Sequence, residues 1–133
     1  MKKKVLIIVI FYVVMSLLLN PLYRSEESIR KTLLRITPLG TDMEKALKVI
    51  KRKVQWNVSY IDYEHGYFAQ RWSKEAEEHY LTTGEPLVIG VMSIEVYLGG
   101  YWAFFITDVT AFWGFDESGK LIDICVAKDT DSP

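Results

Sequence analysis

Glu75 and His79 are the residues whose types and spacing come closest to a catalytic pair. If residues 73–80 form a helix, a spacing of four residues places the carboxylate and the imidazole on one face, where they could pass a proton or hold a metal ion. Two ligands do not make a metal site, because zinc in proteins takes three or four. We therefore interpret this glutamate-rich stretch as a solvated helix or loop, and an enzyme with a carboxylate–histidine site is an alternative.

Cys125 is the only cysteine, so no intramolecular disulfide can form. A reactive thiolate needs a positive and accessible setting, whereas the neighbours of Cys125 in residues 121–127 are mainly apolar or acidic. The sequence also lacks the Gly-x-Ser-x-Gly, His-Glu-x-x-His, Walker and Gly-x-Gly-x-x-Gly motifs. We therefore expect a packed, inert thiol and predict neither catalysis nor a cofactor or metal ion.

Aromatic side chains are in surplus in the strand-forming second half of the chain. A sheet covered by helices on one face should carry polar residues on the other, but here aromatic residues fall on both parities. We predict a partner-binding face for a protein or for a second copy of the chain, formed by Tyr97, Tyr101, Phe105 and Trp113. The alternatives are that residues 60–80 cover this face, or that one strand has a different register.

Charge is unevenly distributed along the chain, although the formal net charge is only −1. Residues 24–53 hold nine Lys or Arg against four Asp or Glu, and residues 54–133 hold four against thirteen. The basic helix face of Lys45, Lys48 and Arg52 could lie on anionic lipid headgroups, unless it is solvated or faces the acidic half. No basic stripe interleaved with aromatic residues is present in the sequence, so we do not expect nucleic acid as a partner.

Residues 1–23 have the composition of a membrane-targeting segment. Three lysines precede Val5–Leu19, a run of fifteen residues in which only Ser16 is polar. No small-residue cleavage site follows, and extension through Tyr23 brings the run close to the length of a membrane span. We predict an uncleaved single-pass anchor in the cell membrane (through residues 5–23), with the N-terminus cytoplasmic and the domain extracytoplasmic. A cleaved signal, which gives a secreted protein, and a buried core helix are the alternatives.

Two helices are predicted to follow the leader. Ser25 can cap the first, whose apolar residues share one face, and Pro38 and Gly40 end it. Thr41 and Glu44 have the spacing of a capping box before a second amphipathic helix that extends to Val54.

Alternation of apolar and polar residues then predicts strands with hairpin turns between them. The strands are expected at residues 56–60, 88–98, 101–106, 109–115 and 121–127, with turns at Gly99-Gly100 and at residues 116–119. The first turn pairs Leu98 with Tyr101 if its loop has two residues, or with Trp102 if it has three. For residues 24–128 this order predicts an α+β domain, with the two helices on one face of a three- to five-stranded antiparallel β-meander. Residues 129–133 are expected to form a frayed tail.

The segments ITPLGTDMEKALKVI and TAFWGFDESGKLIDICV carry a family resemblance. Gly40 and Thr41 match the helix entry, and the final hairpin matches at Phe115, Asp116, Gly119, Lys120 and Leu121. On these residues the chain resembles the SmpA/OmlA (BamE-type) lipoproteins, whose domain is similar in outline to β-lactamase-inhibitor-type domains. The resemblance implies two helices on a three-stranded sheet and a role in binding proteins. The lipidated cysteine of that family is missing, and the apolar leader stands in its place.

Together these features predict a membrane-anchored, extracytoplasmic module that binds a protein and does not catalyse a reaction. A small inhibitor or immunity-type protein, which would bind an enzyme at the membrane through its acidic half, is the alternative in the same class.

Overall fold

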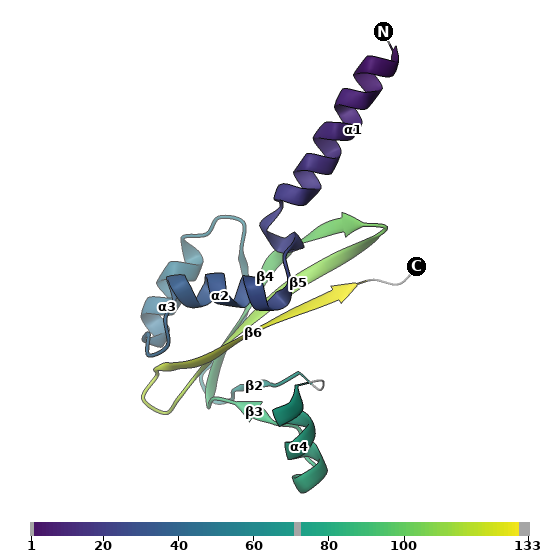
Figure 1. Ribbon diagram of the computed structural model, residues 1–133. Helices are drawn as coiled ribbons and strands as arrows, with labels where there is room; N and C mark the ends of the chain where they lie inside the picture. The colour runs from purple at the N-terminus through teal and green to yellow at the C-terminus, as the bar shows by residue number, and fades with distance from the viewer. Residues whose placement is uncertain (1, 71–72, 131–133) are drawn as a thin grey trace.

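The computed structural model describes residues 2–70 and 73–130, with the backbone alone for residues 16–19 and 103. In this part of the chain four α-helices accompany a four-stranded antiparallel sheet, which confirms the predicted α+β class (Figure 1). The elements are α1 (Lys2–Leu19), the 3-10 helix η1 (Pro21–Tyr23), α2 (Glu26–Ile36), α3 (Met43–Lys51), β1 (Asn57–Asp62), β2 (Tyr67–Phe68), α4 (Lys74–Thr83), β3 (Val88–Ile89), β4 (Met92–Ala103), β5 (Phe105–Phe115) and β6 (Leu121–Thr130). The main sheet has the order β1-β4-β5-β6, and β2 and β3 form a separate pair.

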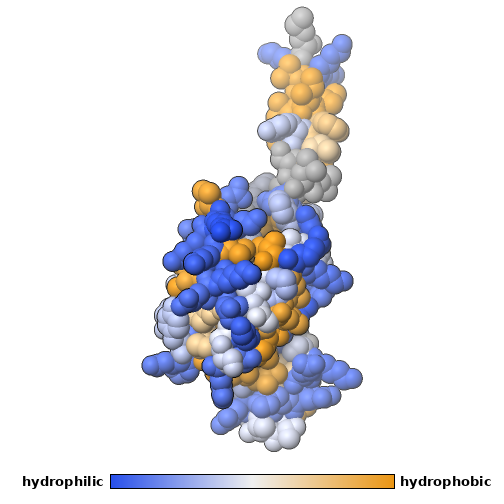
Figure 2. Space-filling view, turned by 90° about the vertical axis from the view of Figure 1, so that its left-hand side faces the viewer, coloured by the Kyte–Doolittle hydropathy of each residue, from blue (hydrophilic) through white to orange (hydrophobic). Residues whose placement is uncertain are grey.

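Helix α1 stands clear of the rest of the protein. Figure 2 shows it as a separate column, hydrophilic at its N-terminal end and mainly apolar in the part below that is drawn in colour. In residues 2–70 and 73–130 no helix is both long enough and apolar enough to cross a membrane, so the structure gives the predicted single-pass anchor no support.

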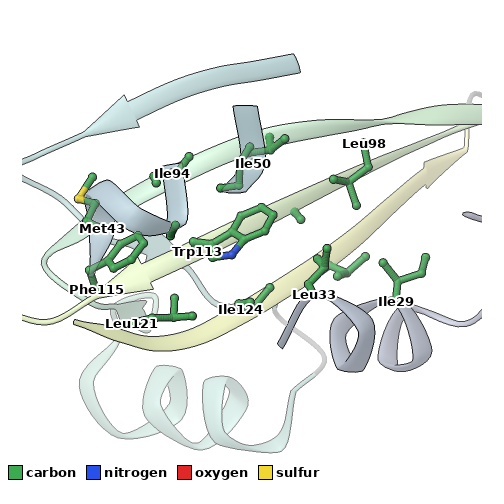
Figure 3. Close-up of a cluster of buried hydrophobic side chains, with 14 of the residues drawn as sticks. Ile29, Leu33, Met43, Ile50, Ile94, Leu98, Trp113, Phe115, Leu121 and Ile124 are labelled. Atoms are coloured by element: carbon green, nitrogen blue, oxygen red, sulfur yellow. The ribbon is translucent and has the colours of Figure 1, made fainter. Parts of the chain in front are cut away.

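Helices α2 and α3 cover one face of the main sheet, and the core lies between these two layers (Figure 1). The cap predicted for α2 is confirmed, because Ser25 Oγ accepts a hydrogen bond from the Ser28 amide at 3.1 Å. Ile29 and Leu33 of α2 are buried, and Figure 3 shows Leu33 next to Trp113 in the middle of the cluster, with Ile29 further along the helix.

The start of α3 differs from the predicted capping box. Asp42 is the N-cap residue and makes no side-chain cap. Its carboxylate instead accepts a hydrogen bond from Lys120 Nζ at 2.5 Å, while Thr41 Oγ1 donates to the Pro38 carbonyl. The predicted capping box of Thr41 and Glu44 is therefore wrong, because Thr41 is not the N-cap residue and its hydroxyl binds the turn before the helix. The helix also ends earlier than expected, and Val54 lies beyond it, 97% exposed.

Gly99-Gly100 is not a turn, which corrects the predicted hairpin. Strand β4 runs through both glycines, and the chain reverses at Phe104, between the paired residues Ala103 and Phe105. Gly99 has a φ of +128° at a shift in register, and a Cβ there would lie 3.1 Å from Leu22 Cδ1. The positive φ favours glycine at this position, and the approach of η1 leaves little room for a Cβ.

The second face of the main sheet is covered in part by the segment between β1 and β4. Tyr67 of β2 packs on Phe112 of β5, with 5.7 Å between ring centroids. The contact needs Gly114, because a Cβ at that position would lie 2.8 Å from Tyr67 Cε1. One of the alternatives to an exposed aromatic face, coverage by this segment, therefore holds over this part of the sheet.

Strand β6 continues to Thr130, beyond the residue at which the tail was expected to begin. Thr130 Oγ1 lies 3.0 Å from Thr107 Oγ1 across the sheet. The rest of the predicted tail, residues 131–133, lies outside the described residues.

Candidate functional site

The four aromatic residues predicted to form one binding face lie in three different places. Trp113 is 0% exposed and donates from Nε1 to Thr37 Oγ1 at 3.0 Å in the core, so its placement on a surface is wrong. Tyr97 is half-buried on the second sheet face, where its hydroxyl donates to Asp108 at 2.7 Å. This hydrogen bond raises the pKa of the Tyr97 hydroxyl. Only Tyr101 and Phe105 lie near each other, at the end of the β4–β5 hairpin.

That hairpin end exposes apolar side chains that the sequence analysis did not group together. We call Trp102, Phe104, Phe105 and Ile106 the β4–β5 tip; their exposed fractions are 65%, 89%, 41% and 53%. The run of apolar residues was visible in the sequence, but the turn expected at Gly99-Gly100 assigned it to the strand that follows this turn, and not to a turn of its own.

The β4–β5 hairpin is joined to the base of α1 by η1. The rings of Tyr23 and Tyr101 lie 5.3 Å apart, centroid to centroid. Lys128 Nζ lies 5.0 Å from the centroid of the Tyr101 ring and donates to the Arg24 carbonyl at 2.5 Å. These contacts fix the direction in which the hairpin leaves the domain relative to η1.

The predicted basic face is exposed on α3 but does not point at one target. Arg52 lies at the C-terminal end of the helix, next to Lys53, which lines a pocket of about 260 Å³ together with Leu22 of η1. Lys45 and Lys48 instead line a hollow beside the β5–β6 turn, with Ser118 and Gly119. Of the three cations, Arg52 is therefore the one that adjoins, in the sequence, the pocket that η1 lines.

Strands β2 and β3 and helix α4 form a small projection, which we call the distal lobe. It lies at the opposite end of the molecule from α1 (Figure 1). Phe68 and Val88 form a cross-strand pair and are 71% and 46% exposed, and Tyr80 and Leu81 of α4 are 55% and 76% exposed. The sequence of the lobe also contains four carboxylates close to these apolar residues: Glu75, Glu77, Glu78 and Glu85.

A groove of about 640 Å³ separates the distal lobe from α2 and β6. Its wall includes Tyr67, which is 5% exposed and whose hydroxyl has no hydrogen-bond partner among the described residues. Burial raises the pKa of this hydroxyl, so it stays a neutral donor. Leaving a buried hydroxyl unpaired costs about 1–3 kcal/mol, so a bound polar group would find a donor ready.

The opposite wall of this groove is held by Arg30 of α2. Its Nη2 donates to Asp123 Oδ1 at 2.6 Å, and its Nε donates to the Ile124 carbonyl on the outer edge of β6 at 2.8 Å. The hydrogen bond to Asp123 raises the pKa of the guanidinium. Gln70 Nε2 similarly donates to the Val126 carbonyl at 2.9 Å, so side chains cover part of the β6 edge.

The residues considered for catalysis give no assembled site. Glu75 and His79 lie one turn apart on α4, and within the described residues no group of three or more His, Cys, Asp or Glu side chains could hold a metal ion. Burial, together with the negative charge of Asp123, raises the pKa of the Cys125 thiol to about 11. A thiol with that pKa is a poor nucleophile near neutral pH.

No family model, no curated protein and no solved structure matches the chain. The resemblance to the SmpA/OmlA lipoproteins therefore stays a prediction from two short segments.

Proposed function

We propose that this chain is a membrane-attached module that binds a partner protein and does no chemistry of its own. The observation that carries the proposal is the division of the molecule into two ends. An exposed apolar helix leaves one end, and an exposed apolar and acidic lobe forms the other (Figure 1).

Membrane attachment through α1 is supported by the exposure of its side chains. Every residue from Val5 to Val14 is between 46% and 72% exposed, so apolar groups surround the helix on all sides. A helix that is apolar all round belongs in an apolar medium. Lipid hydrocarbon removes this surface from water, at about 25 cal/mol per Å² of apolar area. The lysines at its start can extend to the headgroups.

Protein binding is assigned to the distal lobe and the adjoining groove. Exposed apolar residues rimmed by charged ones are typical of interaction sites. The carboxylates of α4 favour a partner that presents basic residues around an apolar centre. The unpaired hydroxyl of Tyr67 supplies a buried polar contact in the groove beside the lobe.

The test uses the full-length protein in its native membrane, with a photo-crosslinking residue at Leu81 and a matched control at the exposed Ser118. We expect the probe at Leu81 to capture one protein. An excess of unlabelled wild-type protein should compete with the probe and reduce this capture, whereas unlabelled protein with the Leu81→Glu substitution should not. Because the lobe is acidic, capture should fall as salt is raised. Capture only from position 118, or none from either position, would contradict the assignment.

A second copy of the chain captured at Leu81 would make the lobe a dimer interface instead. If the captured protein is an enzyme, its activity with and without the chain tests the inhibitor alternative.

A further inference from the structure

We propose that the β4–β5 tip is a second membrane contact, which lies in the interfacial region of the same bilayer that holds α1. This inference rests on the proposed attachment through α1 and assigns the tip a lipid surface as its partner.

The first argument is the composition of the tip and the conformation of its backbone. Phe104 has a φ of +64°, a left-handed conformation that bulky residues rarely adopt. The Phe104 side chain is 89% exposed and lies in the turn between the exposed Trp102 and Ile106. Aromatic residues with apolar neighbours are enriched where proteins meet the membrane interface. Glycine or asparagine would suit the backbone better, so phenylalanine here is unexplained by folding alone.

The second argument is position. Tyr23 at the base of α1 contacts Tyr101, which directly precedes Trp102, so the tip begins at the point where α1 joins the domain. In Figure 1 the β4–β5 hairpin extends on the side of the domain from which α1 leaves. A bilayer that surrounds α1 therefore begins beside the hairpin, and the tip needs no separate partner to be covered.

The third argument is the charge around η1. Lys128 and Arg24 lie next to the Tyr23–Tyr101 contact, and Lys53 lines the same pocket as η1. Arg52, the C-cap residue of α3, directly precedes Lys53 in the sequence. Each cation near an anionic lipid surface contributes attraction. Val54, 97% exposed in the loop after α3, gives this end of the domain a further apolar side chain. An apolar tip with cations behind it fits a bilayer with anionic headgroups better than it fits a basic protein surface.

The experiment places the full-length protein in vesicles that contain anionic lipid, with and without brominated acyl chains, which quench nearby tryptophan. The emission of Trp102 is obtained by subtracting the spectrum of the Trp102→Phe variant from that of the wild type. We expect the emission of Trp102 in vesicles to lie at shorter wavelength than in the denatured chain in water. In brominated vesicles we expect this emission to lose intensity.

The decisive variant is Phe104→Asn with Ile106→Thr, since asparagine suits the left-handed backbone and threonine suits a strand. It should float with vesicles as the wild type does, because α1 is unchanged, but its Trp102 should no longer be quenched by bromine. Tyr63→Ser, which removes an exposed aromatic side chain from the loop after β1, should leave the quenching of Trp102 as in the wild type.

Three results would overturn the inference. If the wild type floats with vesicles but Trp102 is quenched by acrylamide and not by bromine, the tip lies in water and only the α1 attachment stands. If Trp102 is shielded from both quenchers, a second copy of the chain covers the tip instead of lipid. If the wild type does not float, the attachment through α1 and this inference both fail.

Discussion

At the scale of single residues, the core depends on one buried polar pair. Trp113 Nε1 donates to Thr37 Oγ1 at 3.0 Å, and the same hydroxyl donates to the Leu33 carbonyl at 2.8 Å, near the end of α2. Both Trp113 and Thr37 are 0% exposed. The pair thus connects the end of α2 to the middle of the sheet. Because both groups are buried, water cannot replace either partner of the hydrogen bond.

We predict that Thr37→Val lowers the free energy of unfolding by about 1–3 kcal/mol, because it leaves the indole N–H of Trp113 buried without an acceptor. Thr37→Ser keeps the hydroxyl and should cost less. Urea unfolding of the full chain in detergent micelles, followed by tryptophan fluorescence, measures both. Equal losses for the two variants would show that the hydroxyl does not matter.

Cys125 gives a second prediction at this scale. Because burial raises the pKa of its thiol to about 11, the native thiol stays protonated through pH 9, and the alkylation rate with iodoacetamide should rise only toward pH 11. In the urea-unfolded chain the midpoint should move down to near the ordinary thiol value of about 8.5. A native midpoint at or below the unfolded one would contradict the burial of the thiol.

At the scale of elements, local sequence patterns predicted the structure correctly where a pattern has one common conformation. Ser25 caps α2 as predicted, and residues 116–119 turn between β5 and β6 because Asp116 Oδ1 accepts from the Ser118 and Lys120 amides. Gly99-Gly100 was misread, because paired glycines serve a turn and a close approach between elements equally well. Only the contact with Leu22, a residue far away in the sequence, decides between them.

We predict that Gly99→Ala destabilises the domain by about 1–3 kcal/mol, since it combines a strained φ with a Cβ close to Leu22. It should also speed amide hydrogen exchange in η1, where the Tyr23 amide donates to the Asn20 carbonyl. Gly84→Ala is the control, because it has a positive φ but no atom within 4 Å of the added Cβ. Unchanged exchange in η1 with Gly99→Ala would mean that η1 is not held by this contact.

At the scale of the whole molecule, the α+β class and the layer of two helices followed from the sequence, but the candidate surfaces did not. Phe112 and Trp113 are adjacent and so occupy opposite faces, and which one is buried depends on the register of β5 with β4 and β6. Tyr67 gave no signal, since its contact with Phe112 joins segments that are distant in the sequence. Periodicity within one strand carries no information about either pairing.

The two-ended arrangement is the central claim, and it depends first on the surroundings of α1. The most direct measurement places a photo-crosslinking residue at Phe11, 66% exposed in the middle of the apolar run, in the full-length protein in native membranes. Mass analysis then identifies what is attached to it. Our account predicts adducts with lipid acyl chains. Adducts with protein alone, whether a partner or a second copy of the chain, would contradict it and make α1 a protein-binding helix.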